Sequence, residues 1–364
     1  MRETVIGSIR FATALAGAVI VSAGAVQRVE AQPERLEYRV VQAAPRELQR
    51  RIDEAGREGY TCVSVARPEP DVRLNGVVVI LARPWSTTVS SPPRARHRVE
   101  RAAGGGSDLQ SLLDRSGSEG FRLCGVALAE VSPFPVLVAV MSRPVDGDTG
   151  QWHYAAEVLG QKDRLARLVA KAREGFVPVA ASPVGDNRVV EMRNWILVTE
   201  RSATSAEPID LAIRSGPGPD SLQRAIAEQS KEGHIANLLW KEGNTTMVAA
   251  MSRSPVNSTV RPEFVVETID PSRLDGLSGV YIGDVPYLSD GQRVVLTIKD
   301  RSASNSVVED RLPFMGPLDY ADTNAMRPLG EHLWRNRYRL TASSIRRGKD
   351  GGLVLHTVLT RLSP

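Results

Sequence analysis

The sequence predicts an α+β fold of tandem βαββ repeats, whose antiparallel sheets carry their helices packed on one face. Three observations predict this fold: a recurring Glu-Gly motif, a helical pattern of apolar residues before it, and two apolar runs after it. The motif glycines are 61, 55 and 58 residues apart, and such regular self-similarity indicates a repeat architecture. They are Gly59, Gly120, Gly175 and Gly233, followed in turn by Tyr, Phe, Phe and His.

A helix is expected immediately before each of these glycines. A leucine ten or eleven positions upstream and an apolar residue seven positions upstream lie on one helix face. The residues seven positions upstream are Ile52, Leu113, Leu168 and Ile226. A glycine just past a helix adopts a positive φ without steric cost and closes the helix end. The next residue can then fold back over the apolar stripe.

Each helix is expected to follow one strand and to precede a pair of strands. The first strands are predicted at 37–41, 97–101, 153–158 and 208–213. The hairpins are predicted at 61–66 with 77–82, 122–127 with 136–140, 177–181 with 195–199, and 235–240 with 246–251. Three of the hairpins close with Arg and Pro, and proline ends a strand because it cannot donate to the ladder.

The C-terminal third is interpreted as two degenerate copies. In the fifth copy a strand is expected at 264–269, a short helix at 272–277, and Gly279 stands where the motif glycine stood. In the sixth copy Asn336 replaces the glycine, and a hairpin is expected from 339–345 and 353–360.

The predicted repeat boundaries follow from these patterns. They are 36–84, 96–144, 152–201 and 207–255 for the first four copies, and 262–301 and 307–364 for the degenerate copies. A unit of about 50 residues buries too little apolar surface to be secure alone. The copies are therefore expected to pack against one another.

Residues 1–31 are interpreted as a secretory signal peptide. Residues 11–26 form an uncharged run of 16 residues, shorter than the roughly 20 residues of a membrane-spanning helix. Small residues flank a cleavage site after Ala31, with a second possible site at 23–25. The alternative is an uncleaved N-terminal anchor. We therefore expect a periplasmic or secreted protein without a transmembrane segment in the mature chain.

The composition excludes several classes of protein. The chain is 42% hydrophobic and 24% charged, which argues against a disordered chain, a collagen and a polytopic membrane protein. The 46 basic and 42 acidic side chains leave a net charge of +4, a weak excess that indicates no nucleic-acid partner.

The two cysteines, Cys62 and Cys124, could form a disulfide or remain free thiols. An oxidising compartment permits a bridge. However, Cys62 lies two residues past Tyr60, whereas Cys124 lies three past Phe121, and a strand period of two places the two thiols on opposite sides. This phase favours two buried free thiols over a bridge.

A set of motifs in the first copy carries a family resemblance. These motifs are Leu36-Glu37-Tyr38-Arg39-Val40-Val41, Leu48-Gln49, Glu58-Gly59-Tyr60 and Arg83-Pro84. The pattern resembles a family of small bacterial βαββ domains of unknown function, with a Tyr-rich strand, a Leu helix, a Glu-Gly-Trp-like motif and a closing Arg-Pro. In this chain Tyr60, Phe121, Phe176 and His234 replace the tryptophan. The resemblance covers roughly two-thirds of the mature chain by repeat and implies the fold but no chemistry.

Motifs for catalysis, cofactors or metals are weak. Gly104-Gly105-Gly106-Ser107 precedes a helix without a Walker lysine, so Ser107 or Asp108 is interpreted as a helix cap. The segment from Asp146 to Glu157 has acidic residues at three calcium-loop positions, but Gln151 stands where glycine is needed. His97 and His153 are weak metal candidates, because pseudo-symmetric packing of copies two and three could bring their rings together.

The leading functional hypothesis is an exported, noncatalytic repeat protein that acts as a binding or scaffolding module. It rests on the observation that features shared between copies are packing features, whereas polar residues vary. The expected partner is an unknown protein or small ligand, and the sequence indicates no catalytic residues and no cofactor. The alternative is a periplasmic enzyme whose site forms between repeats, around His97, His153 or the C-terminal third; converging polar groups in a cleft would favour it.

Overall fold

The computed structural model describes most of the chain from residue 36 to residue 362. The gaps are 69–71, 73–75, 85–93, 103–105, 132–133, 146–149, 161, 185–193, 205–206, 243–245, 254–260, 271–272, 274–276, 288–290, 301–302, 312–337 and 349. The predicted signal peptide, the first four residues of the calcium-loop segment, four of the six residues of the helix expected at 272–277, and Asn336 lie outside the described residues.

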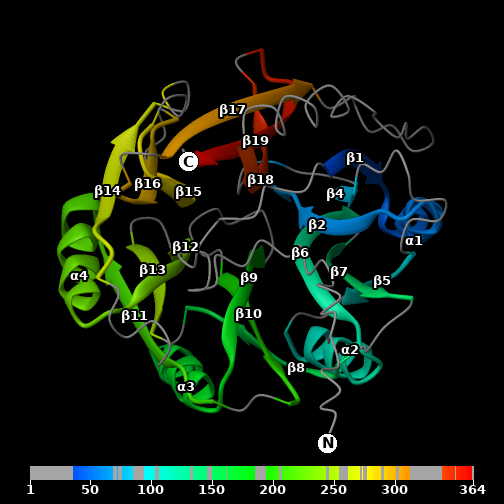
Figure 1. The fold of residues 1–364 in the computed structure, drawn as a ribbon, viewed down its shortest axis with the longest axis horizontal. Coiled ribbons are helices and arrows are strands. Elements are labelled where there is room, and N and C mark those ends of the chain that lie inside the picture. The colour runs from blue at the N-terminus through cyan, green and yellow to red at the C-terminus, as the bar shows by residue number, and fades with distance from the viewer. Residues whose placement is uncertain are drawn as a thin grey trace, which may run out of the picture.

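The described residues form a mixed α+β ring of six antiparallel sheets and four helices (Figure 1). Sheet 1 contains β1 (Leu36–Ala43), β2 (Thr61–Val65) and β4 (Val77–Pro84); sheet 2 contains β5 (Ala95–Ala102), β6 (Arg122–Val131) and β7 (Phe134–Pro144). Sheet 3 contains β8 (Trp152–Val158), β9 (Val177–Val184) and β10 (Asn194–Ser202); sheet 4 contains β11 (Asp210–Gly216), β12 (Ile235–Glu242) and β13 (Thr246–Arg253). Sheet 5 contains β14 (Phe264–Ile269), β15 (Val280–Pro286) and β16 (Arg293–Ile298); sheet 6 contains β17 (Ala303–Arg311), β18 (Tyr338–Arg347) and β19 (Leu353–Leu362). A two-residue strand, β3 (Arg67–Pro68), extends sheet 6.

Every sheet has the same strand order, with the third strand in sequence between the first and the second. The first strands lie toward the outside of the ring and the second strands lie toward its axis (Figure 1). We call the six second strands (β2, β6, β9, β12, β15 and β18) the central strands. In the first four sheets, a helix of 12 or 13 residues connects the first strand to the central strand.

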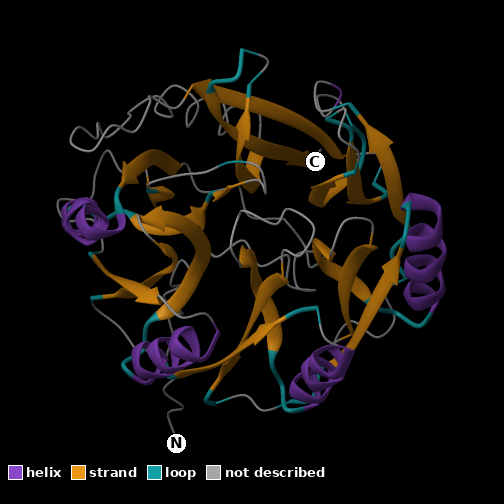
Figure 2. Ribbon diagram, turned by 180° about the vertical axis from the view of Figure 1, so that it is seen from behind, coloured by secondary structure: helices purple, strands orange, loops and turns teal. Residues whose placement is uncertain are grey.

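The helices α1 (Pro45–Arg57), α2 (Gly106–Ser118), α3 (Lys162–Arg173) and α4 (Pro219–Lys231) lie along the outer rim (Figure 2). Each ends as the motif predicts. The motif glycines Gly59, Gly120, Gly175 and Gly233 all have φ between 85° and 90°. In each case the next residue donates its backbone N–H to a carbonyl in the last turn, for example Tyr60 to Ala55 at 3.1 Å, which satisfies a terminal carbonyl.

An arginine from the third strand holds each helix end in place. Its Nη1 donates to the carbonyl of the motif glutamate, at 2.7–3.1 Å; the donors are Arg83, Arg143, Arg201 and Arg253. The first three also stack on the motif aromatic, with guanidinium-to-ring distances of 4.5–4.8 Å. The arginine therefore links the carboxyl end of the helix dipole and the aromatic ring to the sheet. Arg201 does so although no proline follows it.

Neighbouring sheets pack face to face, with one apolar cluster for each of the six interfaces around the ring. In the cluster between sheets 1 and 2, Leu48 and Ile52 of α1 pack together with Val138 and Val140 of β7. The alternate β7 residues, including Met141, belong to the next cluster with α2 and sheet 3. The third strands are thus buried on both faces, which explains their continuous apolar runs.

The ring closes between the last sheet and the first. Leu340, Ile345 and Leu359 of sheet 6 share a cluster with Val40 and Ile80 of sheet 1. In addition, β3 pairs in parallel with Ser344 and Ile345 of β18. This closure covers the two faces that an open array would leave exposed to water.

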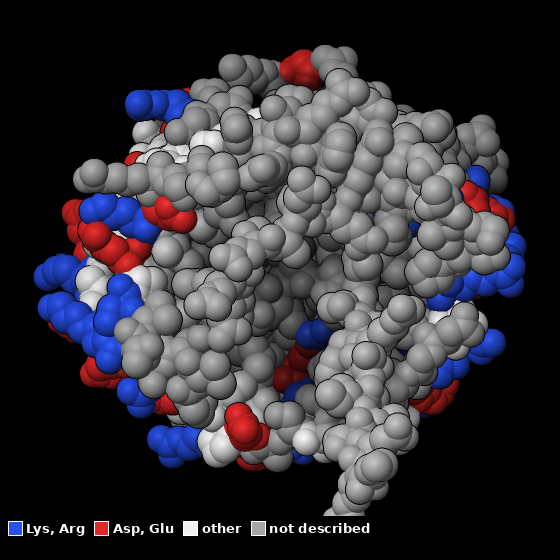
Figure 3. Space-filling view, in the orientation of Figure 1, with Lys and Arg blue, Asp and Glu red and all other residues white. Residues whose placement is uncertain are grey.

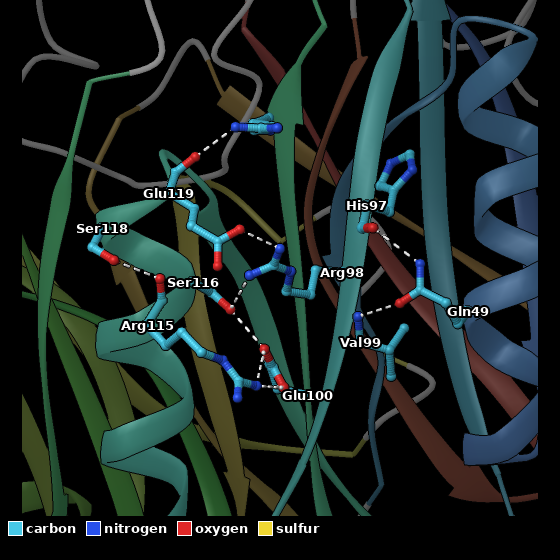
Figure 4. Close-up of polar contacts among 10 residues, drawn as sticks. Gln49, His97, Arg98, Val99, Glu100, Arg115, Ser116, Ser118 and Glu119 are labelled. Carbon is cyan, nitrogen blue, oxygen red and sulfur yellow. Dashed lines mark hydrogen bonds and ion pairs between the residues drawn. The ribbon is translucent and has the colours of Figure 1, made fainter.

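Helix glutamines hold the outer edge of the next sheet. Gln49 of α1 donates to the His97 carbonyl at 3.0 Å and accepts from the Val99 N–H at 2.8 Å (Figure 4). Gln110 makes the same pair of bonds with Tyr154 and Ala156 of β8, and Gln223 with Phe264 and Val266 of β14. Each glutamine satisfies backbone groups that an edge strand would otherwise leave open.

A small residue three positions before the motif glycine permits this close approach. A Cβ at Gly117 would lie 2.3 Å from the Trp152 carbonyl oxygen, and a Cβ at Gly56 would lie 2.5 Å from that of Ala95. Ala172 and Ser230 occupy the same position and bond to the chain just before the first strand of the next sheet. The Ala172 carbonyl accepts from the Ile209 N–H, and the Ser230 hydroxyl donates to the Pro262 carbonyl.

The preference for free thiols at Cys62 and Cys124 is wrong: the two residues form a disulfide between sheets 1 and 2, with Cα atoms 6.0 Å apart. The strand phase does place them on opposite faces. However, in a stack of sheets one face of a sheet meets the opposite face of the next, so opposite phase is what a bridge between neighbours requires. Cys124 is also the extra residue of a β-bulge in β6.

No helix of the described residues is long and apolar enough to span a membrane.

The glutamine contact predicts a measurable loss of stability. Gln110→Ala leaves the Tyr154 carbonyl and the Ala156 N–H without their partner, and should lower the free energy of unfolding by about 1–3 kcal/mol. The control is Ser111→Ala on the exposed side of the same helix, with an expected change within about 0.5 kcal/mol. Chemical denaturation of both variants checks this, and equal effects would contradict the assigned role of Gln110.

Candidate ligand site on the ring axis

A cavity of about 190 Å³ lies on the axis of the ring, and residues of all six central strands line it. Figure 3 shows a hollow near the middle of the face seen in Figure 1, with acidic and basic side chains in its depth. Most of its lining comes from the central strands, and third strands add Glu200 of β10 and His356 of β19.

A β-bulge at a corresponding position in each central strand shapes the cavity wall. The register against the third strand shifts by one residue in all six sheets. In the first four sheets the extra residue lies four positions after the motif glycine, and these residues are Val63, Cys124, Val179 and Asn237. A bulge bends its strand and re-aims side chains, so the repeat places one residue per sheet near the axis.

The wall is mixed, with polar and apolar surface in similar amounts. Its apolar side chains include Val63, Val179, Leu238 and Ile282. Its polar side chains are Ser64, Glu200, Asn237, Tyr281, Asp284, Ser343, Ser344, Arg346 and His356. A cavity in which polar groups converge beside apolar side chains has features of a small-molecule site.

Glu200 of β10 is the acidic group on the sheet 3 side of the cavity. Its side chain is 4% exposed and pairs with Arg122 of β6, the closest N–O distance being 2.7 Å. Arg122 also stacks on Trp152, 4.5 Å from the ring centre. Burial raises the pKa of the Glu200 carboxyl, against the opposing effect of Arg122. The pair joins sheets 2 and 3 beside the axis.

A second charged group joins sheets 5 and 6. Asp284 of β15 accepts hydrogen bonds from Arg293 of β16 and Arg346 of β18. Burial opposes ionisation, but the two guanidinium groups hold the pKa of Asp284 well below its ordinary value. Burial, reinforced by Arg346, lowers the pKa of His356 to about 3. His356 is therefore a neutral imidazole at pH 7.

Sheets 6 and 1 meet at the cavity through two hydroxyl groups. The Oγ atoms of Ser64 in β2 and Ser343 in β18 lie 2.8 Å apart. Beside this cavity, a disulfide joins sheets 1 and 2, an ion pair joins sheets 2 and 3, and a hydroxyl contact joins sheets 6 and 1. The Asp284 ion cluster joins sheets 5 and 6.

The two histidines singled out from the sequence lie outside the cavity. His97 is buried on the side of β5 that faces α1 (Figure 4), against Gly56, whereas His153 of β8 is exposed. Within the described ranges, no group of three or more His, Cys, Asp or Glu side chains could hold a metal ion. Of the C-terminal third, named in the enzyme hypothesis, His356 does reach the cavity.

The cavity residues Glu200 and Asn237 were missed from the sequence, although a signal was present. Glu200 stands directly before the helix-holding arginine, where the other three copies have Ala82, Ser142 and Ser252. Asn237 is the polar exception at the bulge position. Both signals are departures from the repeat, and they become visible only when the copies are aligned on the arginine and the bulge.

Comparisons with known proteins give no assignment: no family model, curated protein or solved structure matches this chain.

The burial of His97 predicts a pH dependence of stability. Burial lowers its pKa from 6.5 to about 4. Between these two pH values the imidazole is therefore protonated in the unfolded chain and neutral in the folded chain. The free energy of unfolding should therefore fall by about 2 kcal/mol from this residue between pH 7 and pH 5. His97→Leu should remove that part of the decline.

Urea denaturation of the wild-type protein and of His97→Leu at both pH values measures the two declines. An unaltered decline in His97→Leu would show that this imidazole is not held neutral by burial.

Proposed function

We propose that the protein is an exported, noncatalytic binding protein whose ring of sheets is a scaffold around a ligand cavity. The observation that carries this proposal is the convergence of all six central strands on one cavity with a mixed apolar and polar wall. The features repeated between sheets, such as the motif glycine and the helix-holding arginine, stabilise the ring. The polar residues of the cavity differ from sheet to sheet, as expected of a site specialised on a repetitive scaffold.

We also propose that the fold is a set of six repeated units and that the protein is exported. We take the six sheets as copies of one βαββ unit, similar to the small bacterial domain family that the first copy resembles. The Cys62–Cys124 disulfide supports an exported location, because such bonds persist in oxidising compartments.

An enzyme is the second candidate, favoured by the buried Glu200 carboxyl with its raised pKa on the cavity wall. Perturbed pKa values are typical of catalytic groups, but structural ion pairs cause them too. Glu200 and Asp284 are both engaged with arginines of a neighbouring strand or sheet. Their contacts support a role in joining sheets, and binding is therefore the preferred function.

Native mass spectrometry on protein purified from the exported fraction tests the proposed function. The wild-type protein should carry a noncovalent mass that leaves on denaturation. Val179→Phe fills the cavity from the β9 bulge and should lose that mass. Val145→Phe, at a position 40% exposed, is the matched control and should keep it. Retention of the mass by Val179→Phe would place the ligand elsewhere, and a bare wild-type protein would oppose a tightly held small ligand.

A further inference from the structure

The cavity wall contains two buried hydrogen-bond acceptors that the described protein leaves unused. Oε1 of Glu200 accepts from Nε of Arg122 at 2.9 Å, whereas Oε2 has no hydrogen-bond donor in the described part of the chain. The neighbouring Tyr154 hydroxyl also interacts with the Glu200 carboxyl, but it accepts from the Leu123 N–H at 2.8 Å and directs its one proton to the Phe121 carbonyl at 3.3 Å. Glu200 is 3% exposed, so bulk water does not compensate Oε2.

The second acceptor is the side-chain oxygen of Asn237, in the bulge of β12. Nδ2 of Asn237 donates to the Ser252 hydroxyl, while Oδ1 is buried without a donor among the described residues. Both residues line the cavity, Glu200 from sheet 3 and Asn237 from sheet 4, its neighbour in the ring. Buried polar atoms are nearly always paired, so two unused acceptors at one cavity indicate a missing donor.

We propose that the axial cavity binds a small organic ammonium group, held by the Glu200 carboxylate and the Asn237 side-chain oxygen. The inference rests on the proposed binding function and names the ligand class for that site. An ammonium group has three donors and no acceptor, which matches the two acceptors on the part of the wall formed by sheets 3 and 4, whereas Arg346 lines the part formed by sheet 6. Its hydrogen bonds to a carboxylate are charge-assisted and are the stronger kind.

The apolar part of the wall suits the rest of such a ligand. Val179 and Ala180 of sheet 3 and Leu238 of sheet 4 line the cavity, on the same two sheets as the two acceptors. A cavity of about 190 Å³ has room for a short alkyl chain but not for a drug-sized molecule. The ligand class is therefore a primary amine on a short carbon chain.

The test uses three probes of nearly equal size: propylammonium chloride, 1-propanol and sodium propionate. Binding is measured by the rise of the unfolding temperature and by isothermal titration calorimetry, against sodium chloride at equal ionic strength. Propylammonium should bind to the wild-type protein, and 1-propanol and propionate should bind at least about tenfold more weakly, because they lack a charge-assisted donor.

Three variants locate the site. Glu200→Gln and Asn237→Ala should each weaken propylammonium binding, the first by at least about tenfold. Glu228→Gln, an exposed carboxyl on α4, is the matched control and should bind as the wild type does. Asn237→Ala keeps the test decisive if Glu200→Gln fails to fold.

The outcomes separate this inference from the proposed function. Binding of propionate or 1-propanol in preference to propylammonium, lost in Val179→Phe, would overturn the ammonium inference and retain the cavity as a binding site. Failure of propylammonium to bind, or binding unaffected by Glu200→Gln and Asn237→Ala, would overturn the ammonium inference. The native mass of the purified protein then decides the proposed function independently.

Discussion

The face-to-face packing of sheets is the constraint on which the rest of the structure depends. Each third strand presents apolar side chains on both faces, and burying one Val, Leu or Ile side chain contributes about 1.5–3 kcal/mol. A three-stranded sheet with one helix covers only part of this surface. The six apolar clusters show that neighbouring sheets cover the remainder, and that sheet 6 covers sheet 1.

The contacts between neighbouring sheets differ between the rim of the ring and its axis. At the rim the contacts repeat: a glutamine from the helix meets the next edge strand, and a small residue lets the helix approach. At the axis the contacts differ from interface to interface, as a disulfide, an Arg–Glu pair and an Asp–Arg cluster. Burying charges is costly unless they are paired, and these pairs place charged groups on a cavity wall of mixed polar and apolar character.

The local structure could be predicted from the sequence far better than the assembly. The strands of the first four sheets and the hairpin of β18 and β19 lie where period and turn residues predicted them. The motif glycines have the expected positive φ. Closure was not predictable, because contacts such as β3 with β18 join residues far apart in the chain. The disulfide was misjudged because the argument from strand phase treated the two segments as one sheet face.

The cavity residues were hidden for a related reason. A bulge shifts the side-chain phase of each central strand, so a strict period of two assigns the later residues to the wrong face. Glu200 lies one residue past the strand predicted at 195–199, and its role appears only when Arg122 of the neighbouring sheet is placed against it. Polar groups that act between sheets carry no local sequence pattern.

The central claim is that the six sheets close into a ring around the cavity. The most direct test is a double variant, Ser64→Cys with Ser343→Cys, at positions whose side-chain oxygens lie 2.8 Å apart across 279 residues of sequence. Peptide mapping of the oxidised protein should find positions 64 and 343 joined within one chain. Ser118→Cys with Ser343→Cys, which places one thiol at the exposed end of α2, should give no such link. Absence of the 64–343 link, or equal linking in the control pair, would contradict a closed ring.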